Sequence, residues 1–146
     1  MLAGNIMDVQ IKTLRPSDPA SEAVRIILET GVGEVAVVDL EGALLGVVSE
    51  AALLKAMPFY GPAPGSGQKN LSISEATAAD FLEKDFFNLP PETPLSGVAE
   101  LFAATGKRAA VVFILDAGGR LLGGISAQDL LKREWKNPKK KEEKGK

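Results

Sequence analysis

The sequence predicts a mixed α+β fold (α/β mixed) in which a β-α-β-β-α unit occurs twice in tandem. Two observations lead to this prediction: the chain repeats itself at a nearly constant spacing, and both copies show the same order of extended and helical patterns. With 146 residues, of which 45% are hydrophobic and 25% charged, the chain is long enough to bury a core without disulfides.

The repeat is visible as residue matches at two offsets, 75 residues in the first part of the unit and 77 in the second. At the smaller offset the matches are Pro16/Pro91, Pro19/Pro94, Ser21/Ser96 and Thr30-Gly31/Thr105-Gly106. At the larger offset they are Asp39/Asp116, Gly42/Gly119, Leu44-Leu45-Gly46/Leu121-Leu122-Gly123, Ser49/Ser126 and Leu53-Leu54-Lys55/Leu130-Leu131-Lys132. Turn and cap residues recur together with the apolar positions, which indicates a duplicated unit.

Each unit begins with a short extended segment that ends at a proline, over residues 11–14 in the first copy and 86–89 in the second. A helix follows at Asp18-Pro19 and at Thr93-Pro94, where we expect the Asp or Thr to be the N-cap and the proline the first helical residue. Both helices are expected to end at a glycine in the left-handed conformation, Gly31 and Gly106.

Two β-rich runs and a second helix complete each unit. The runs flank a tight turn, at residues 39–42 in the first copy and 116–119 in the second. The closing helices are expected over residues 50–57 and 127–136, each followed by a proline within two residues.

The domain organisation follows from the repeat and from composition. We expect the first repeat at residues 5–57 and the second at 78–136. Residues 58–77 hold three prolines and three glycines, which is typical of an exposed linker. Residues 137–146 form a charged tail that we expect to be disordered.

The chain has no cysteine and no histidine, which excludes disulfides, thiol nucleophiles, Cys/His zinc sites and histidine-dependent acid–base chemistry. No nucleophile, base or carboxylate cluster stands at a recognisable catalytic spacing. We therefore expect no catalytic residues, no metal site and no enzymatic activity.

Charge and hydropathy restrict the partners and the compartment. Residues 132–146 hold eight Lys or Arg and three Glu, a net +5, whereas residues 1–131 hold nine basic and sixteen acidic groups, a net −7. An acidic body does not suit nucleic acid, although RNA or DNA binding through the basic tail is left open as a weaker alternative. Apolar runs fall short of the roughly 18–20 residues of a membrane-spanning helix, and the first ten residues do not resemble a secretory signal. We expect a cytoplasmic protein without a membrane partner.

The repeat resembles the cystathionine-β-synthase-type (CBS) domain, and the pair resembles the tandem arrangement called a Bateman module. The residues that carry the resemblance are VAVVDLEGALLGVVS (35–49) and VVFILDAGGRLLGGISAQDLL (111–131). They share a strand, an Asp/Gly turn, an apolar-Gly pair and a Ser, and in the second copy an Asp follows three residues after the Ser. The resemblance implies two repeats packed sheet to sheet with pseudo-two-fold symmetry, two ligand clefts between them, and a homodimer.

The resemblance also implies a regulatory function. Many members of the family bind adenosine compounds such as AMP, ADP, ATP or S-adenosylmethionine and report their occupancy to an enzyme, channel or transporter. For this chain it implies a stand-alone module that senses an adenosine-type ligand, requires no cofactor, and signals to a separate and unknown protein target.

The resemblance places the ligand at the last motif, where Ser126 contacts phosphate and Asp129 accepts hydrogen bonds from ribose hydroxyls. A helix N-terminus offers free N–H groups and a partial positive charge that suit phosphate. The further contacts that it implies are Gly124, Ile125, Ile11, Lys12 and Val32, with Lys107 and Arg108 as candidates for binding phosphates. In the first copy Ser49 is present but Ala52 replaces the Asp. We therefore expect the other of the two clefts, the one at Ser49 and Ala52, to be degraded as a ligand site.

Each of these assignments has a plainer alternative. Ser126 and Asp129 also fit a capping box, which needs no ligand. Lys107 and Arg108 fit a solvated strand start equally well, and Trp135 either covers the core or marks a dimer contact. The alternative function is therefore a ligand-independent dimerisation or scaffold module with a decayed nucleotide pocket.

Overall fold

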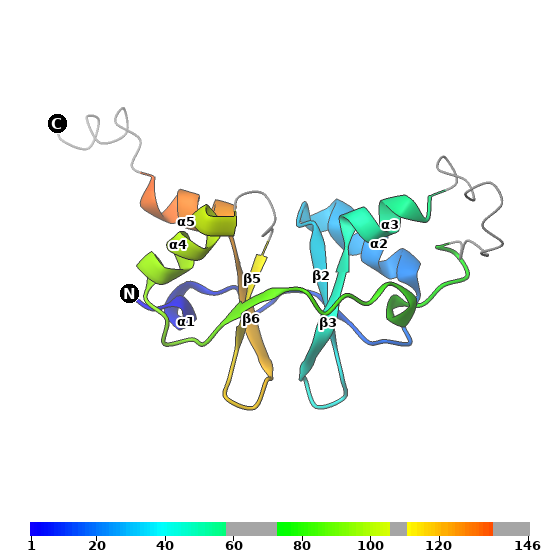
Figure 1. The fold of residues 1–146 in the computed structure, drawn as a ribbon, viewed down its shortest axis with the longest axis horizontal. Coiled ribbons are helices and arrows are strands. Elements are labelled where there is room, and N and C mark those ends of the chain that lie inside the picture. Colours follow the sequence, from blue (N-terminus) through cyan, green and yellow to red (C-terminus); the bar gives the residue numbers. More distant parts are fainter. Residues whose placement is uncertain (58–72, 106–110, 136–146) are drawn as a thin grey trace.

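The computed structural model describes residues 1–57, 73–105 and 111–135. Its elements in chain order are α1 (Ala3–Ile6), β1 (Thr13–Leu14), α2 (Ala20–Thr30), β2 (Glu34–Val38), β3 (Leu44–Ser49), α3 (Glu50–Lys55), the 3-10 helix η1 (Ala78–Phe81), β4 (Phe87–Leu89), α4 (Leu95–Thr105), β5 (Val111–Leu115), β6 (Leu121–Ser126) and α5 (Ala127–Glu134). The β-α-β-β-α order occurs twice, as predicted, and the fold is mixed α+β (Figure 1). A short helical turn that the sequence patterns did not predict precedes each copy.

Each repeat contributes one three-stranded sheet with the same topology, β1-β2-β3 in the first repeat and β4-β5-β6 in the second. In both sheets the short first strand pairs in parallel with the second, and the second pairs antiparallel with the third. Gly42 and Gly119 adopt positive φ angles of 86° and 84° at the two hairpin turns, where a side chain would be strained. Asp39 and Asp116 fix these turns by accepting backbone N–H groups within them.

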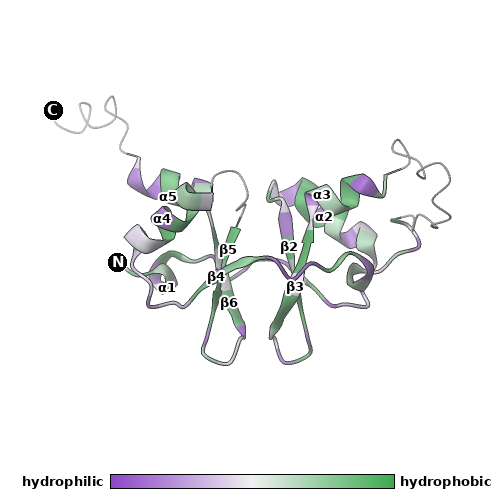
Figure 2. Cartoon of the chain, in the orientation of Figure 1, coloured by the Kyte–Doolittle hydropathy of each residue, from purple (hydrophilic) through white to green (hydrophobic). Residues whose placement is uncertain are grey.

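The strands are buried on both faces because helices cover one face and the other sheet covers the opposite face. In the second repeat Val112, Ile114 and Ile125 pack with Val98 of α4 and Leu130 of α5. The residues that alternate with them, Val111 and Phe113, face the first sheet and form a third buried cluster with Ala36 and Val47 of that sheet. Figure 2 shows the resulting hydrophobic strands at the centre of the molecule.

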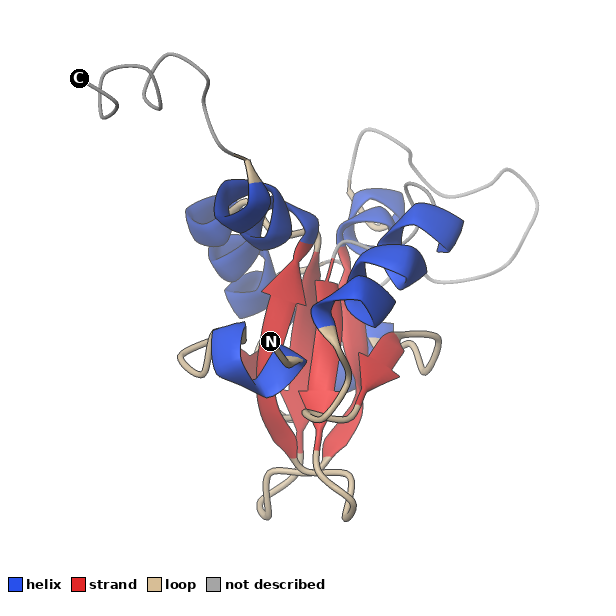
Figure 3. Ribbon diagram, turned by 90° about the vertical axis from the view of Figure 1, so that its left-hand side faces the viewer, coloured by secondary structure: helices blue, strands red, loops and turns tan. Residues whose placement is uncertain are grey.

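The two sheets pack face to face, and their hairpins lie side by side at the edge of the molecule away from the helices (Figure 3). Leu44 N donates to Gly119 O at 3.1 Å and Leu121 N donates to Gly42 O at 2.9 Å, so the hairpin turns are joined by a reciprocal pair of hydrogen bonds. The two hydrogen bonds join equivalent residues of the two repeats, as the predicted pseudo-two-fold symmetry requires.

The predicted N-caps of the first helices are wrong. Helix α2 begins at Ala20 with Pro19 at the N-cap position and no side-chain cap, because the carboxylate of Asp18 accepts from Arg15 N instead. Helix α4 begins at Leu95, and the hydroxyl of Thr93 donates to Pro90 O. Both side chains therefore close the turn before the helix. The left-handed end at Gly31 is confirmed, with φ 74°, whereas Gly106 lies outside the described residues.

The two repeats exchange short segments. Helix α1 packs on the second repeat, where Ala3 N donates to Thr93 O and Asp8 N donates to Gly124 O. In the same manner the segment that carries η1 packs on the first repeat, where Ala78 N donates to Asp18 O. Residues 73–77 of the predicted linker belong to this second segment, since Ile73 contacts the core of the first repeat. The rest of that linker and the charged tail lie outside the described residues.

None of the helices in the described ranges is long and apolar enough to cross a membrane. In the same ranges no group of three or more carboxylates gathers in a way that could hold a metal ion.

Candidate ligand cleft

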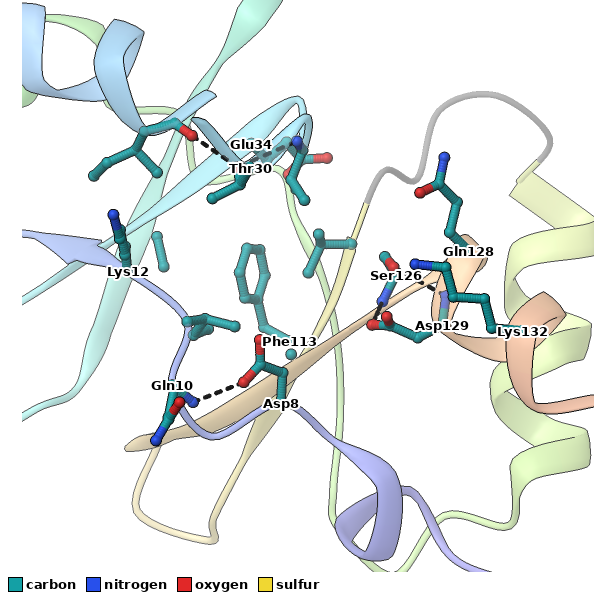
Figure 4. Close-up of a pocket in the computed structure, with 16 residues that line it drawn as sticks. Asp8, Gln10, Lys12, Thr30, Glu34, Phe113, Ser126, Gln128, Asp129 and Lys132 are labelled. Atoms are coloured by element: carbon teal, nitrogen blue, oxygen red, sulfur yellow. Dashed lines mark hydrogen bonds between the residues drawn. The ribbon is translucent and has the colours of Figure 1, made fainter. Parts of the chain in front are cut away.

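A cleft of about 300 Å³ opens between the two repeats, on the side where Ser126 lies (Figure 4). This volume is at the lower end of the range for small-molecule sites, roughly 300–1,000 Å³. Both repeats line it, with Asp8, Gln10, Ile11, Lys12, Ile26, Thr30, Val32, Glu34 and Ala36 from the N-terminal part of the chain and Val111, Phe113, Gly124, Ser126, Gln128, Asp129 and Lys132 from the second repeat.

The floor of the cleft is apolar and belongs to the contact between the sheets. Phe113, 2% exposed, and Ala36 are buried there, with Ile11 packed against them. A Cβ atom at Gly124 would lie 3.3 Å from Val111 Cγ1 and 3.4 Å from Ile11 Cδ1. The missing side chain at Gly124 therefore lets Val111 and Ile11 lie close to the strand, and together they form an apolar surface that suits the ring system of a small ligand.

Ser126 and Asp129 stand together at the N-terminus of α5. The Oγ atom of Ser126 accepts from Asp129 N at 3.1 Å, and Oδ2 of Asp129 accepts from Ser126 N at 3.0 Å. This is the capping box that the sequence left open as an alternative. Within the described part of the chain, the hydroxyl proton of Ser126 and the second carboxylate oxygen of Asp129 make no further hydrogen bond. The cap therefore leaves one donor and one acceptor available to a ligand.

The opposite side of the cleft carries Lys12, whose ammonium is already paired. Its Nζ lies 2.6 Å from Oε2 of Glu29, and Arg25 bridges Glu29 and Glu22 along α2. The hydrogen bonds from Lys12 and Arg25 lower the pKa of the Glu29 carboxyl below its ordinary value. Thr30, on the same side, donates its hydroxyl to Ile26 O at 2.8 Å.

The structure brings together six of the nine residues predicted for the working cleft, namely Ser126, Asp129, Gly124, Ile11, Lys12 and Val32. Ile125 points to the other face of its strand and is fully buried in the core of the second repeat. Lys107 and Arg108 lie outside the described residues.

Several lining residues were missed by sequence reasoning. Asp8 and Gln10 belong to the exchanged N-terminal segment, and no local pattern shows where such a segment docks. Two other lining residues, Gln128 and Lys132, could have been predicted from the sequence, because they are on the same helix as Asp129. Lys132 follows Asp129 by three residues and therefore lies on the same side of the helix.

The equivalent position in the first repeat is arranged differently. Ser49 caps α3 by accepting from Ala52 N at 3.1 Å, and its hydroxyl donates to Oε1 of Glu83 at 2.5 Å. Ala52 has no side-chain acceptor to offer a ligand.

Comparison with known proteins places this geometry in a family. The family model described as "CBS domain" matches residues 3–58 and 78–136. Among solved structures, CBSX2 of Arabidopsis thaliana in complex with AMP is 20% identical, with a TM-score of 0.71 over 90% of this chain and 94% of that chain. The CBS domain pair of protein MJ0100, in complex with 5-methylthioadenosine and S-adenosyl-L-methionine, is 16% identical, with a TM-score of 0.69 over 91% and 94%. The cytosolic domain of the Mg2+ channel MgtE in complex with ATP is 22% identical, with a TM-score of 0.67 over 90% of this chain and 48% of that chain.

One curated relative is an A-adding tRNA nucleotidyltransferase of Aquifex aeolicus (strain VF5), 24% identical over 127 residues. The match covers 87% of this chain but only 14% of the relative. The family model spans most of the chain in two segments that coincide with the two structural repeats. The chain therefore belongs to the CBS domain family, as a tandem CBS pair, or Bateman module.

Proposed function

We propose that the chain is a regulatory CBS-pair module that binds an adenosine-type ligand (AMP, ADP, ATP or S-adenosylmethionine) and signals to a separate protein partner. The observation that carries the proposal is the cleft in which Ser126 and Asp129 face an apolar floor supplied by both repeats. The AMP, ATP and S-adenosylmethionine complexes of other CBS-pair proteins support the choice of ligand class.

The polar and apolar parts of the cleft match the parts of an adenosine compound. The N-terminus of α5 and the Ser126 hydroxyl offer donors to a phosphate or another acceptor. The free oxygen of Asp129 accepts ribose O–H groups, and the floor around Phe113 and Ile11 takes the base. Lys107 and Arg108 stay in the proposal as phosphate-binding residues.

The signal would arise from linkage between binding and the arrangement of the repeats. Lys12 and Thr30 lie on one side of the cleft, and Ser126 and Lys132 lie on the other (Figure 4). A ligand that contacts both sides stabilises the arrangement in which they are close, and a partner that binds this arrangement better is recruited or released.

The module acts in this proposal as a homodimer without catalytic activity, and the ligand is a signal and not a required cofactor. The match to the nucleotidyltransferase does not argue against this, because it covers a small fraction of that enzyme. A cytoplasmic location, expected from the sequence, remains part of the proposal.

The proposal is tested by calorimetric titration and thermal-shift measurements with AMP, ADP, ATP and S-adenosylmethionine on the wild type and on Asp129→Ala. Losing hydrogen bonds to a charged carboxylate should cost about 1.5–3 kcal/mol, or roughly 10- to 150-fold in affinity. A ligand at about 100 times its Kd should stabilise the wild type by about 2.7 kcal/mol.

Asp80→Ala is the matched control, because Thr77 and Asp80 form the same capping box at η1, which does not line the cleft. Both variants lose a cap of similar value, about 0.5–1 kcal/mol. Only Asp129→Ala should lose ligand affinity. If the two variants bind alike, the role of Asp129 in the site is refuted.

The capping box also supports a second function, a ligand-independent scaffold, because it accounts for Ser126 and Asp129 without any ligand. In that case no adenine compound at millimolar concentration shifts the melting temperature. The contact with the protein partner is then insensitive to Asp129→Ala.

A further inference from the structure

We propose that the carboxylate of Glu83 binds Ser49 in place of a ligand. At the equivalent position of the other repeat stands Asp8, whose shorter side chain leaves Ser126 available to a ligand. This inference rests on the proposed function and deepens it, because it limits each chain to one adenosine-type ligand and names the position that decides which cleft takes it.

Asp8 and Glu83 are equivalent in their backbone placement. Asp8 N donates to Gly124 O at 2.9 Å and Gly124 N donates to Asp8 O at 3.1 Å. Glu83 and Val47 exchange the same two hydrogen bonds, both at 2.8 Å. Gly124 and Val47 each stand two residues before the serine of their cleft, so the two carboxylate side chains start from matching points.

The two side chains nevertheless end differently. Glu83 has one more methylene group, and its carboxylate reaches the hydroxyl of Ser49 in a short 2.5 Å hydrogen bond of the charge-assisted kind. Asp8 turns back on its own segment, where its Oδ1 accepts from Gln10 N at 2.9 Å. The Ser49 hydroxyl therefore uses its proton on Glu83 and accepts from Ala52 N, while the proton of Ser126 is left for a ligand.

The apolar walls differ in the same sense. Two residues that line the Ser126 cleft, Ile11 and Gly124, have larger counterparts at the matching positions near Ser49, which are Phe86 and Val47. Phe86 and Phe113 make an edge-to-face contact with ring centroids 6.2 Å apart and planes at 82°. Val47 is only 1% exposed. The larger side chains of Phe86 and Val47 thus fill space near Ser49 that Ile11 and Gly124 do not fill beside Ser126.

The test is a calorimetric titration of the full chain with AMP, ATP and S-adenosylmethionine, on the wild type and on the variants Asp8→Glu and Asp8→Asn. The wild type should bind one molecule per chain. Asp8→Glu should place a carboxylate on Ser126, as Glu83 does on Ser49, and weaken binding by about tenfold or more, which is the effect of losing one hydrogen bond to a charged group. Asp8→Asn reports the loss of charge alone, so the loss in Asp8→Glu should exceed it.

Two molecules bound per wild-type chain, or an Asp8→Glu variant that binds no more weakly than Asp8→Asn, would overturn the inference and leave the proposed function standing. If none of the three compounds binds the wild type, the proposed function falls. The hydrogen bond between Glu83 and Ser49 is then tested without ligand, by a double-mutant cycle of Ser49→Ala and Glu83→Ala in thermal unfolding. If the losses in free energy of unfolding are non-additive, the two side chains interact as proposed, and additive losses would refute this interaction.

Discussion

Two glycines control how closely the exchanged segments approach the strands. A Cβ atom at Gly46 would lie 2.5 Å from Glu83 O, and one at Gly123 would lie 2.7 Å from Asp8 O. Neither glycine has a positive φ, so the backbone conformation itself would accept another residue. What these positions require is the absence of a side chain, since the neighbouring atom is a backbone oxygen that cannot move away alone.

Replacing either glycine should therefore destabilise the fold. We expect Gly46→Ala and Gly123→Ala each to lower the free energy of unfolding by about 1–3 kcal/mol, because the exchanged segment must shift. Gly118→Ala is the control, since its Cβ would meet nothing closer than Asp116 Oδ1 at 3.4 Å, and its effect should stay within about 0.5 kcal/mol. Urea unfolding measures all three. Equal stabilities for the three variants would contradict the close-approach explanation.

The part of the cleft that the sequence predicted is the part carried by a repeated local motif. Ser126 and Asp129 follow a strand and open a helix, so three residues of spacing sufficed to place them side by side. Ile125 was included from the family pattern, and strand alternation turns its side chain into the core. Asp8 and Phe113 could not be predicted, because their position in the cleft depends on how one repeat packs on the other.

At the scale of the elements, helix α2 carries a chain of ion pairs that ends at the cleft. Arg25 joins Glu22 and Glu29 on the helix, and Glu29 in turn holds Lys12 in the segment before β1. The hydrogen bonds from Lys12 and Arg25 hold the pKa of the Glu29 carboxyl below its ordinary value of 4.5. Because these groups are exposed, their contribution to stability is small.

This network gives a pH dependence with a defined sign. A carboxyl group whose pKa is lowered in the folded state stabilises the fold above its unfolded pKa and loses that effect as the pH falls through its folded pKa. The difference in Tm between the wild type and Glu29→Gln should therefore be constant from pH 7 to 6 and shrink below about pH 4.5. A pH series of thermal unfolding measures it, with Glu41→Gln at the exposed hairpin turn as the control. A difference that grows on acidification would contradict the assignment.

The predicted elements agree with the structure where the periodicity is long and differ where packing decides. Helix α2 and strands β2, β3, β5 and β6 follow from hydrophobic pattern and turn residues alone. The four-residue elements α1 and η1 are too short to be stable by themselves and form where they dock on the other repeat. The N-caps failed because Asp18 and Thr93 bond to the preceding turn, a competition that the residue type does not resolve.

At the scale of the whole molecule, the main helices of both repeats lie on one side and the hairpin turns on the other (Figure 1). The helical side exposes several large apolar side chains. Leu28 is 79% exposed on α2, Leu131 is 67% exposed on α5, and Trp135, also 67% exposed, follows α5. Trp135 therefore does not cover the core of the single chain. We propose that the homodimer forms through these exposed apolar residues.

The proposed homodimer is tested by sedimentation of Leu131→Glu. The wild type should sediment as a dimer and the variant should shift toward the monomer, because a buried unpaired carboxylate opposes association. Leu40→Glu is the matched control, since Leu40 is 85% exposed at the β2–β3 turn on the opposite side. A monomeric wild type, or equal dissociation in both variants, would refute this surface.

The exchange of segments also sets the order in which the protein can fold as it leaves the ribosome. Ala78, fully buried in the first core, arrives only after the whole of the first repeat has been made, and the partner of Asp8 is Gly124, which follows it by 116 residues. At about 5–20 residues per second, the N-terminal segment waits about 6–23 s for its partner. Ribosome-bound chains that end before residue 124 should therefore be cut by protease within their first ten residues, and chains extended well beyond it should be protected there. Protection of the shorter chains would mean that the segment finds another partner first. The segment before the first repeat is thus among the last to find its partner, and translation of the second repeat completes the cleft.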